Sequence, residues 1–270
     1  MSRVWLVAWH VFKESVRDRV LFAIGGFAAV LVAASVLLGQ ITAGQDVKII
    51  KDLGVATLEL SGVLIAVFIG VGLVAREIER RSIYSVLAKP VGRTEFVVGK
   101  YLGLVGTIVV NLVVMTAVLY VVLAYLHWQT PDEVERAWVT PVLDPTLLVA
   151  VLLIAAELAL LTAVALFFST FSSSGLLSAA LTLGVFVIGL FSDDLRGFTS
   201  TTGTGVIAPL VQAVGLVVPS FSAFDVKADV VNGRPPVPAM YVVMTVAYAA
   251  CYIAALVAAA SAVFSRREFT

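Results

Sequence analysis

The chain alternates long apolar runs with short polar segments. The runs occupy residues 20–38, 55–75, 102–126, 146–168, 176–191 and 239–264, and Val, Leu, Ala and Gly dominate them. A helix needs about 20 apolar residues to cross a bilayer, and the tolerated range begins at roughly 17. Because lipid offers the backbone no hydrogen-bond partners, such runs must form helices. The pattern therefore predicts an all-α integral membrane protein with six transmembrane helices in a single domain, residues 1–270.

Residues 1–19 form a separate pattern ahead of the first run. Trp5, Ala8, Trp9, Phe12 and Val16 recur at helical spacing on one face, and most charged residues lie off that face. Tryptophans on such a face favour the headgroup level of a bilayer. We predict an amphipathic elbow helix along the cytoplasmic leaflet; a generic membrane anchor is the alternative.

The segment before the last run, residues 192–238, is the least regular part of the pattern. Its residues 206–218 are apolar and are followed by Pro219. This stretch is short for a span and suits a re-entrant or interfacial helix. Extension to Phe224 makes a seventh span, but it places Arg266 and Arg267 on the side opposite to most other basic residues. We therefore predict six spans, with 192–238 outside the cytoplasm and available to an external partner.

Composition supports a membrane location and excludes several other classes. The chain is 60% hydrophobic and 13% charged, whereas soluble domains carry about 25% charged residues. The mean hydropathy is +1.04. Lys and Arg balance Asp and Glu at 18 each, so the charge predicts no nucleic acid partner. The single cysteine, Cys251, excludes a disulfide framework within one chain.

The distribution of basic residues predicts the orientation. With six spans and a cytoplasmic N-terminus, twelve Lys and Arg residues lie on the cytoplasmic side and six lie outside. Cytoplasmic loops carry the excess of basic residues in membrane proteins. We therefore predict a multi-pass protein of the inner, cytoplasmic membrane with both termini in the cytoplasm.

Catalytic and cofactor motifs are absent from the sequence. It contains no GxxxxGK[ST] phosphate-binding loop and no HExxH metal motif, and its only histidines are His10 and His127. A histidine-ligated metal site is not expected. The prediction is that the chain is not an enzyme and binds no cofactor itself.

The densest polar segment, residues 76–100, joins the second and third runs. It reads REIERRSIYSVLAKPVGRTEFVVGK, in which 82–88 can form a short helix that ends before Pro90. Ile83 and Leu87 share one face of that helix, Tyr84 flanks it, and Thr94 can cap the third span. An exposed apolar helix ringed by charge suits docking of a soluble partner; an ordinary solvated loop is the alternative. The residues assigned to partner binding are Glu79, Arg80, Arg81, Ser82, Ile83, Tyr84, Leu87 and Pro90.

This segment resembles the first cytoplasmic loop of ABC exporter permeases of the second exporter class, which carries a coupling helix. The matching positions are Glu79, Arg80, Ser82, Leu87, Pro90, Arg93, Gly99 and Lys100. Residues 218–233, VPSFSAFDVKADVVNG, and the C-terminal FSRREF resemble permeases grouped with multicopper-enzyme maturation. Ser220 stands where that pattern has Asn.

The resemblance implies the transmembrane subunit of a transporter. Two permease copies, as a homodimer or with a related chain, would form the membrane pathway. A separate ATP-binding cassette subunit would dock on the coupling helix and carry ATP and Mg²⁺. The missing phosphate-binding loop agrees with this division of labour.

Three polar residues inside the apolar runs are candidates for the pathway or for helix interfaces. Glu157 lies near the middle of its run, where a charge costs roughly 2.5–3.5 kcal/mol on insertion scales. It must face water, pair with a cation, or be protonated and bonded to a neighbouring helix. Glu59 lies closer to the outer end of its run and can reach the interface, and Asn111 is expected to bond a neighbouring helix. Gly99, Gly103 and Gly106 permit close helix packing.

Two other functions remain open from the residues alone. One is a membrane anchor or assembly subunit of another complex. The other is a proton-coupled secondary carrier that works through Glu157.

Overall fold

The computed structural model describes residues 3–16, 46–79, 92–131, 140–172, 174–192 and 217–266, with single positions 25, 26, 29, 37, 135 and 138. Every regular element in these ranges is helical, which confirms the all-α prediction for this part of the chain. The elements are α1 (Arg3–Val16), α3 (Asp46–Glu79), α5 (Arg93–Gln129), α7 (Thr146–Phe171), α8 (Gly175–Leu190), η1 (Ser222–Phe224), α11 (Lys227–Val231) and α12 (Ala239–Arg266).

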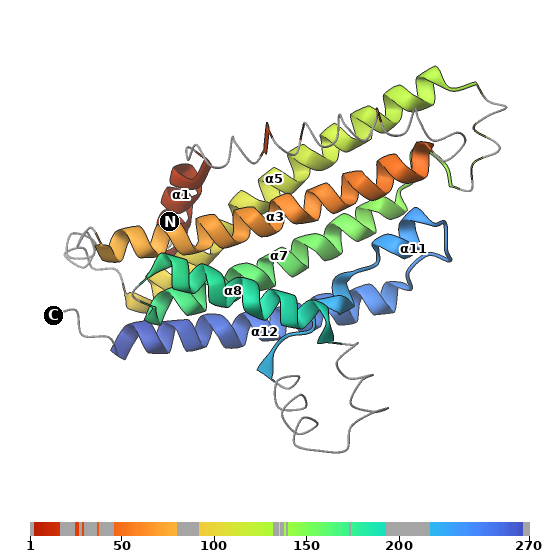
Figure 1. The fold of residues 1–270 in the computed structure, drawn as a ribbon. Coiled ribbons are helices and arrows are strands. Elements are labelled where there is room, and N and C mark those ends of the chain that lie inside the picture. Colours follow the sequence, from red (N-terminus) through yellow and green to blue (C-terminus); the bar gives the residue numbers. More distant parts are fainter. Residues whose placement is uncertain are drawn as a thin grey trace, which may run out of the picture.

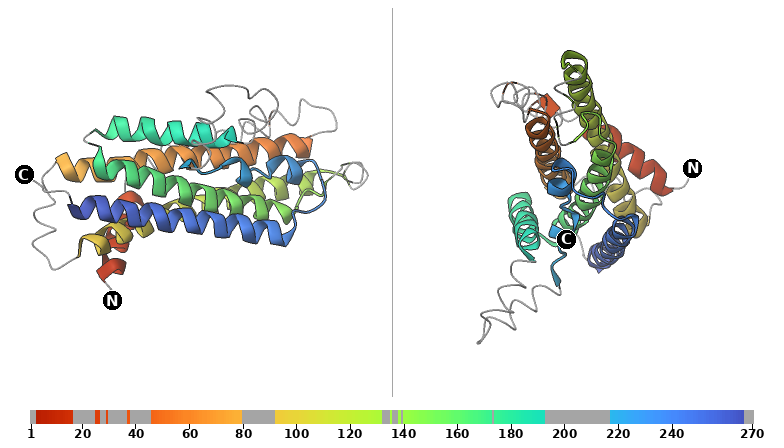
Figure 2. Two further views of the ribbon diagram at one scale, coloured as in Figure 1. Left: turned by 90° about the horizontal axis from the view of Figure 1, so that it is seen from below. Right: turned by 90° about the vertical axis from the view of Figure 1, so that its right-hand side faces the viewer.

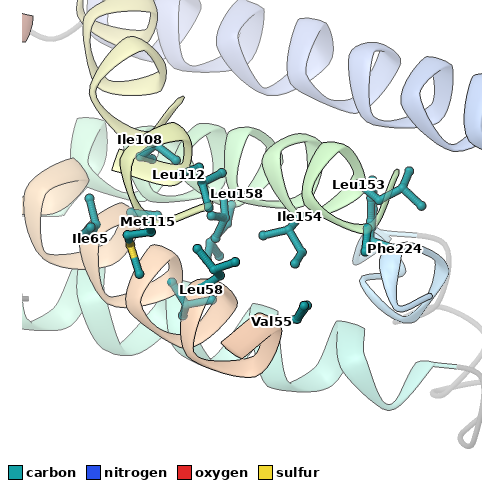
Figure 3. Close-up of a cluster of buried hydrophobic side chains, with 14 of the residues drawn as sticks. Val55, Leu58, Ile65, Ile108, Leu112, Met115, Leu153, Ile154, Leu158 and Phe224 are labelled. Carbon is teal, nitrogen blue, oxygen red and sulfur yellow. The ribbon is translucent and has the colours of Figure 1, made fainter. Parts of the chain in front are cut away.

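The long helices form a bundle around α7. Figures 1 and 2 show α3, α5, α7 and α12 running roughly alongside one another, with α8 on the flank and α1 crossing near the start of α5. Because α7 is apolar on all sides, it can occupy the centre, and Leu153, Leu158 and Leu161 are fully buried. Figure 3 shows the core where α7 meets α3 and α5, with Leu58 and Leu112 beside Leu158.

Four described helices are long and apolar enough to cross a membrane: Val47–Gly70, Thr94–Gln129, Thr146–Phe171 and Ala239–Ser265. They correspond to four of the six predicted runs. The fifth run forms α8, an apolar helix of 16 residues. Most of the first run, 20–38, and nearly all of the predicted re-entrant stretch, 206–218, lie outside the described residues. The count of six spans therefore stays a prediction.

Two helices begin earlier than the apolar pattern predicted. The second run starts at residue 55, but α3 begins at Asp46. The third run starts at residue 102, although the predicted cap already extended this helix back to Thr94, and α5 begins at Arg93. Charged residues interrupt the hydropathy without ending the helix, because Lys51 and Lys100 are buried inside the fold. The prediction that Thr94 caps α5 is also wrong. The backbone N–H of Gly92 instead donates to the Glu95 carboxylate at 2.9 Å.

The face of α1 that packs on the bundle differs from the predicted apolar face. Ala8 and Val11 are buried, but Trp5 and Trp9 are 52% and 54% exposed. The helix is apolar on two sides, so one side contacts α5 while the tryptophans face outward. The contact is close because α5 presents Gly103, where a Cβ would lie 2.6 Å from the Ala8 carbonyl oxygen.

Residues 217–238 form a structured connection that the pattern did not predict. Phe221 is fully buried, stacks edge-on against Phe186 of α8 at 5.1 Å, and donates its N–H to the Gly189 carbonyl at 3.0 Å. The N–H of Ser220 donates to the Tyr248 hydroxyl of α12 at 2.8 Å. These contacts hold η1 and α11 against the bundle, so this segment brings its charged residues to α3 and α7.

Candidate functional site

Glu157 occupies the centre of the bundle. It lies in the middle of α7, is 3% exposed, and neighbours the buried residues Ile154 and Leu158. Among the described residues, no hydrogen bond reaches its carboxyl group. A polar group in such a position is costly unless another group or a proton compensates it. Glu157 is therefore a candidate functional residue, and the groups around it determine how its buried carboxyl group is compensated.

A lysine from the connection before α12 binds the second predicted acid. Lys227, the first residue of α11, donates a hydrogen bond from Nζ to Glu59 Oε2 of α3. The two side chains are 22% and 13% exposed. Glu59 thus lies in an ion pair with the first residue of α11. Its predicted reach to the membrane interface stays a prediction.

Asp225 completes the charged cluster. Its carboxylate Oδ1 lies 3.7 Å from Lys227 Nζ and accepts the Lys227 backbone N–H at 3.2 Å. Burial alone lowers the pKa of Lys227. The hydrogen bond and charge of Glu59, followed by the charges of Asp225 and Glu157, outweigh burial and raise this pKa above its usual value. Lys227 is therefore held as an ammonium ion.

We name the group of Glu59, Glu157, Asp225 and Lys227 the α3–α7–α11 cluster. It joins two of the three predicted intramembrane residues, because the charge of Glu157 acts on Lys227. Lys227 and Asp225 lie in a segment predicted to be external, and neither hydropathy nor charge marked them as partners of the two acids. The signal was indirect: a buried acid within a span requires a partner. Within the described residues, no three His, Cys, Asp or Glu side chains converge as metal ligands.

Asn111 lies apart from this cluster. Its side-chain amide donates to the Thr107 carbonyl of its own helix at 3.0 Å. Among the described residues, Asn111 makes no hydrogen bond to a neighbouring helix. An asparagine in a helix can bond one turn back, and this satisfies its amide without a partner helix.

A second buried ion pair lies where α3 and α7 begin. Lys51 is 0% exposed, and its Nζ lies 3.6 Å from Asp144 Oδ2. The same ammonium donates to the Pro141 carbonyl at 2.6 Å and to Thr140 Oγ1 at 3.3 Å. The charge count includes Lys51 among the six basic residues outside the cytoplasm; in the structure this residue lies within α3, which begins at Asp46. The pair ties the start of α3 to the turn before α7.

The predicted coupling segment begins and ends within helices at the other end of the bundle. Glu79 is the last residue of α3, and α5 begins at Arg93. The remaining predicted partner-binding residues, Arg80, Arg81, Ser82, Ile83, Tyr84, Leu87 and Pro90, lie outside the described residues.

The start of α5 at this end is packed on two sides. Lys100 is 1% exposed, and its Nζ lies 5.1 Å from the centre of the Phe96 ring. Phe96 stacks on Phe264 of α12 at 5.9 Å. On the other side, Arg3 of α1 lies 4.0 Å from Glu95. Helices α1, α5 and α12 are therefore joined near the start of α5 (Figure 2).

Comparison with known proteins gives one assignment. No curated protein matches the chain. A family model described as ABC-2 family transporter protein matches residues 5–269, which is nearly the whole chain. This match confirms the resemblance to permeases of the second exporter class at the level of the family. The membrane-spanning helices agree with it. The chain belongs to the ABC-2 transporter family and is a multi-pass membrane permease of that family.

Proposed function

We propose that this chain is the transmembrane subunit of an ABC export-type transporter. It couples ATP hydrolysis on a separate nucleotide-binding subunit to substrate movement or mechanical signalling across the membrane. The family match across residues 5–269 is the observation that carries this proposal. The chain has no phosphate-binding loop of its own, so ATP and Mg²⁺ belong to the partner subunit.

The coupling site is assigned to residues 76–100, with the apolar face of 82–88 inserted into a groove of the ATPase. Two structural features support this assignment. Helix α3 ends at Glu79 and α5 begins at Arg93, and both of these helix ends lie at the same end of the bundle (Figure 1). The same end carries α1, the proposed elbow helix, and its exposed Trp5 and Trp9 suit the cytoplasmic headgroup layer.

Two permease copies are proposed to form the pathway. Within one chain, α12 and the outer faces of α5 and α8 leave large apolar side chains exposed, among them Met244, Val113 and Leu176. These faces suit lipid and a second permease. The charge pattern predicts the orientation. We place the protein in the inner, cytoplasmic membrane with both termini in the cytoplasm.

An external partner is proposed for the segment 192–238. The turn between α11 and α12 is exposed at Asn232, Arg234 and Pro236. Arg234 is held by an ion pair with Asp229 at 2.8 Å. The same segment carries the resemblance to multicopper-enzyme-maturation permeases, and we place this chain near them.

We expect the paired change Ile83→Asp and Leu87→Asp to release the ATPase subunit while the permease remains inserted in the membrane. Apolar anchors at the centre of an interface carry most of its energy, and buried carboxylates there are strongly unfavourable. Affinity pull-down of the ATPase with tagged permease measures the effect. At least a ten-fold loss is expected, equivalent to about 1.4 kcal/mol.

The matched control is Lys48→Asp, because Lys48 is exposed at the opposite end of α3. Lys51 is unsuitable because it is buried. The control should retain the ATPase fully. Undiminished pull-down of the ATPase by the double variant contradicts the coupling assignment and leaves 76–100 as an ordinary solvated loop.

We expect Glu157→Gln to insert and fold normally but to change transport or permease-stimulated ATPase activity. Glutamine keeps the shape of the side chain and removes its ability to ionise, so the variant tests charge alone. The measurement is the ATPase activity of the reconstituted complex. Asn111→Ala is the control, because Asn111 lies apart from Glu157 and its amide bonds only within its own helix. Wild-type activity of Glu157→Gln shows instead that Glu157 is a protonated structural residue.

A further inference from the structure

Three prolines lie close together in the connection between α11 and α12. Residues 234–238, which we name the proline ridge, read RPPVP. Pro235, Pro236 and Pro238 are exposed, whereas Val237 is partly buried against the core. A proline fixes its own φ at about −65° and holds the residue before it in extended geometry. Each of the first four residues of the ridge is a proline or the neighbour before one, so the sequence favours a polyproline II conformation.

Hydrogen bonds hold the proline ridge at both ends. The N–H of Gly233, which has a φ of 64°, donates to the Val230 carbonyl at 3.4 Å. The N–H of Arg234 donates to the Asp229 carbonyl at 3.0 Å. These two bonds form a Schellman ending of α11, in which a glycine at positive φ turns the chain away from the helix. At the other end, the Pro238 carbonyl accepts an N–H from the first turn of α12 at 2.9 Å. The ridge therefore has a defined position before any partner binds.

The proline ridge does not pack tightly on α7. A pocket of about 40 Å³ is lined by ridge residues on one side and by Thr146 and Val149 of α7 on the other. Figure 1 shows α11 and the loop that follows it at the end of the bundle away from α1. Pro235 and Pro236 are not needed to start α12, because the Pro238 carbonyl already accepts a hydrogen bond from its first turn. The described residues thus leave a rigid apolar edge exposed.

Arg234 places a positive charge at the beginning of this edge. Its Nη1 donates to Asp229 Oδ1 at 2.8 Å, which fixes the direction of the side chain. This is the bond that the guanidinium makes among the described residues, and the side chain is 63% exposed. A guanidinium has five N–H donors, so donors remain for a carboxylate of another molecule. An acidic partner therefore complements this end of the ridge.

We propose that the proline ridge docks in an aromatic-lined groove of an extracytoplasmic protein, and that an acidic side chain beside that groove binds Arg234. Polyproline II has three residues per turn, so Pro235 and Pro238 lie on the same edge. Aromatic-lined grooves recognise such edges, and a preformed ligand loses little entropy on binding. Lipid is a poorer occupant, because one basic residue near a membrane surface contributes only about 1 kcal/mol. The inference rests on the proposed function, since it uses the proposed orientation and names the chemistry of the external partner.

Binding of purified SH3 domains to the full-length protein in lipid nanodiscs tests the proposal. These domains have the required groove, and a panel with an acidic group beside the groove serves as the probe. We expect at least one domain to bind the wild type. Pro235→Ala combined with Pro238→Ala should weaken this binding roughly ten-fold or more, because central contacts dominate an interface. Arg234→Gln should also weaken it, since the charge is lost.

Pro131→Ala is the matched control, because Pro131 is an exposed proline without neighbouring prolines after the end of α5. It should leave the binding unchanged. If the double variant does not fold, Pro235→Ala alone replaces it. The proposal is overturned if no domain binds the wild type or if the proline variant binds equally well. Binding in detergent but not in nanodiscs overturns it in favour of lipid, and a changed oligomeric state of the proline variant overturns it in favour of a second copy.

Two further measurements separate this proposal from the proposed function. The SH3 probe should bind to spheroplasts, which expose the extracytoplasmic side, and not to inside-out vesicles. Binding to inside-out vesicles alone overturns the external assignment together with the proposed orientation. Pull-down of the ATPase by the same wild-type protein reports the transporter assignment independently. If the ATPase is retained while no SH3 domain binds, the docking site is wrong and the transporter assignment stands.

Discussion

Replacing Asp144 with asparagine is expected to lower the free energy of unfolding by about 3–5 kcal/mol, the usual cost of breaking a buried ion pair on one side. The substitution leaves the Lys51 ammonium fully buried and without its counterion. The Pro141 carbonyl and the Thr140 hydroxyl still accept hydrogen bonds from it. These neutral groups cannot replace the lost charge. Equilibrium unfolding in mixed micelles measures the change.

The reciprocal substitution, Lys51→Met, is expected to cost less. The Asp144 carboxylate that remains accepts hydrogen bonds from the Thr146 N–H at 2.9 Å and from its hydroxyl at 2.7 Å. It also lies at the start of α7, where the helix dipole favours a negative charge. Both of these bonds go to Asp144 Oδ1, an acceptor that asparagine retains, so the Asp144→Asn variant isolates the loss of charge.

Combining Lys51→Met with Asp144→Asn should recover most of the stability, because neither charge is then left buried alone. Lys48→Met is the control on the same helix, and its exposed position predicts a change of less than about 0.5 kcal/mol. Strictly additive losses in the double variant contradict the pairing. They would indicate that each residue stabilises the fold through separate contacts.

The helices could be predicted from the sequence wherever lipid and core both require apolar residues. This requirement produces the continuous runs that became α7, α8 and α12. The ends of helices were predicted less well. Hydropathy falls at Lys51 and Lys100, but a buried counterion and an aromatic ring let the helix continue through them. A charge in the sequence signals a boundary only if no partner elsewhere in the fold compensates it.

Only the two acids of the candidate site could be predicted from the sequence. Glu59 and Glu157 stand out because acids within apolar runs are expensive. Their cation, Lys227, is 168 positions away from Glu59 and lies in a segment with no clear periodicity. The fold brings it there through Phe221, which anchors the connection against α8. No local pattern encodes such a contact, because it depends on how two distant segments pack.

The glycines at the start of α5 form a weak sequence motif, and the contacts in the structure show which of them are needed for close packing. Gly99, Gly103 and Gly106 have the spacing of many close-packed helices. In the structure, Cβ atoms at Gly99 and Gly103 would lie 2.7 Å from Val7 Cβ and 2.6 Å from the Ala8 carbonyl oxygen. A Cβ at Gly106 would only touch Phe12, at 3.7 Å. The first two glycines therefore hold α1 against α5, and the third does not.

We expect Gly103→Ala to displace α1 from α5, because the new methyl group meets backbone, which cannot move out of its way as a side chain can. Overpacking of this kind costs typically 1–3 kcal/mol, which shifts the balance between docked and released α1 by roughly 5- to 150-fold. Maleimide labelling of Ser15→Cys reports the release. Ser15 is 1% exposed, and its hydroxyl has no hydrogen bond that the cysteine would break.

The labelling is done in a Cys251→Ala background, because Cys251 is exposed and would react as well. Ser15→Cys alone should label slowly, and adding Gly103→Ala should accelerate the reaction. Gly106→Ala is the matched control, since the same methyl group three residues further along α5 meets only ordinary contact distance. It should leave the rate unchanged. Equal, slow labelling in both glycine variants would show that α1 tolerates the extra methyl and that close glycine packing does not hold it in place.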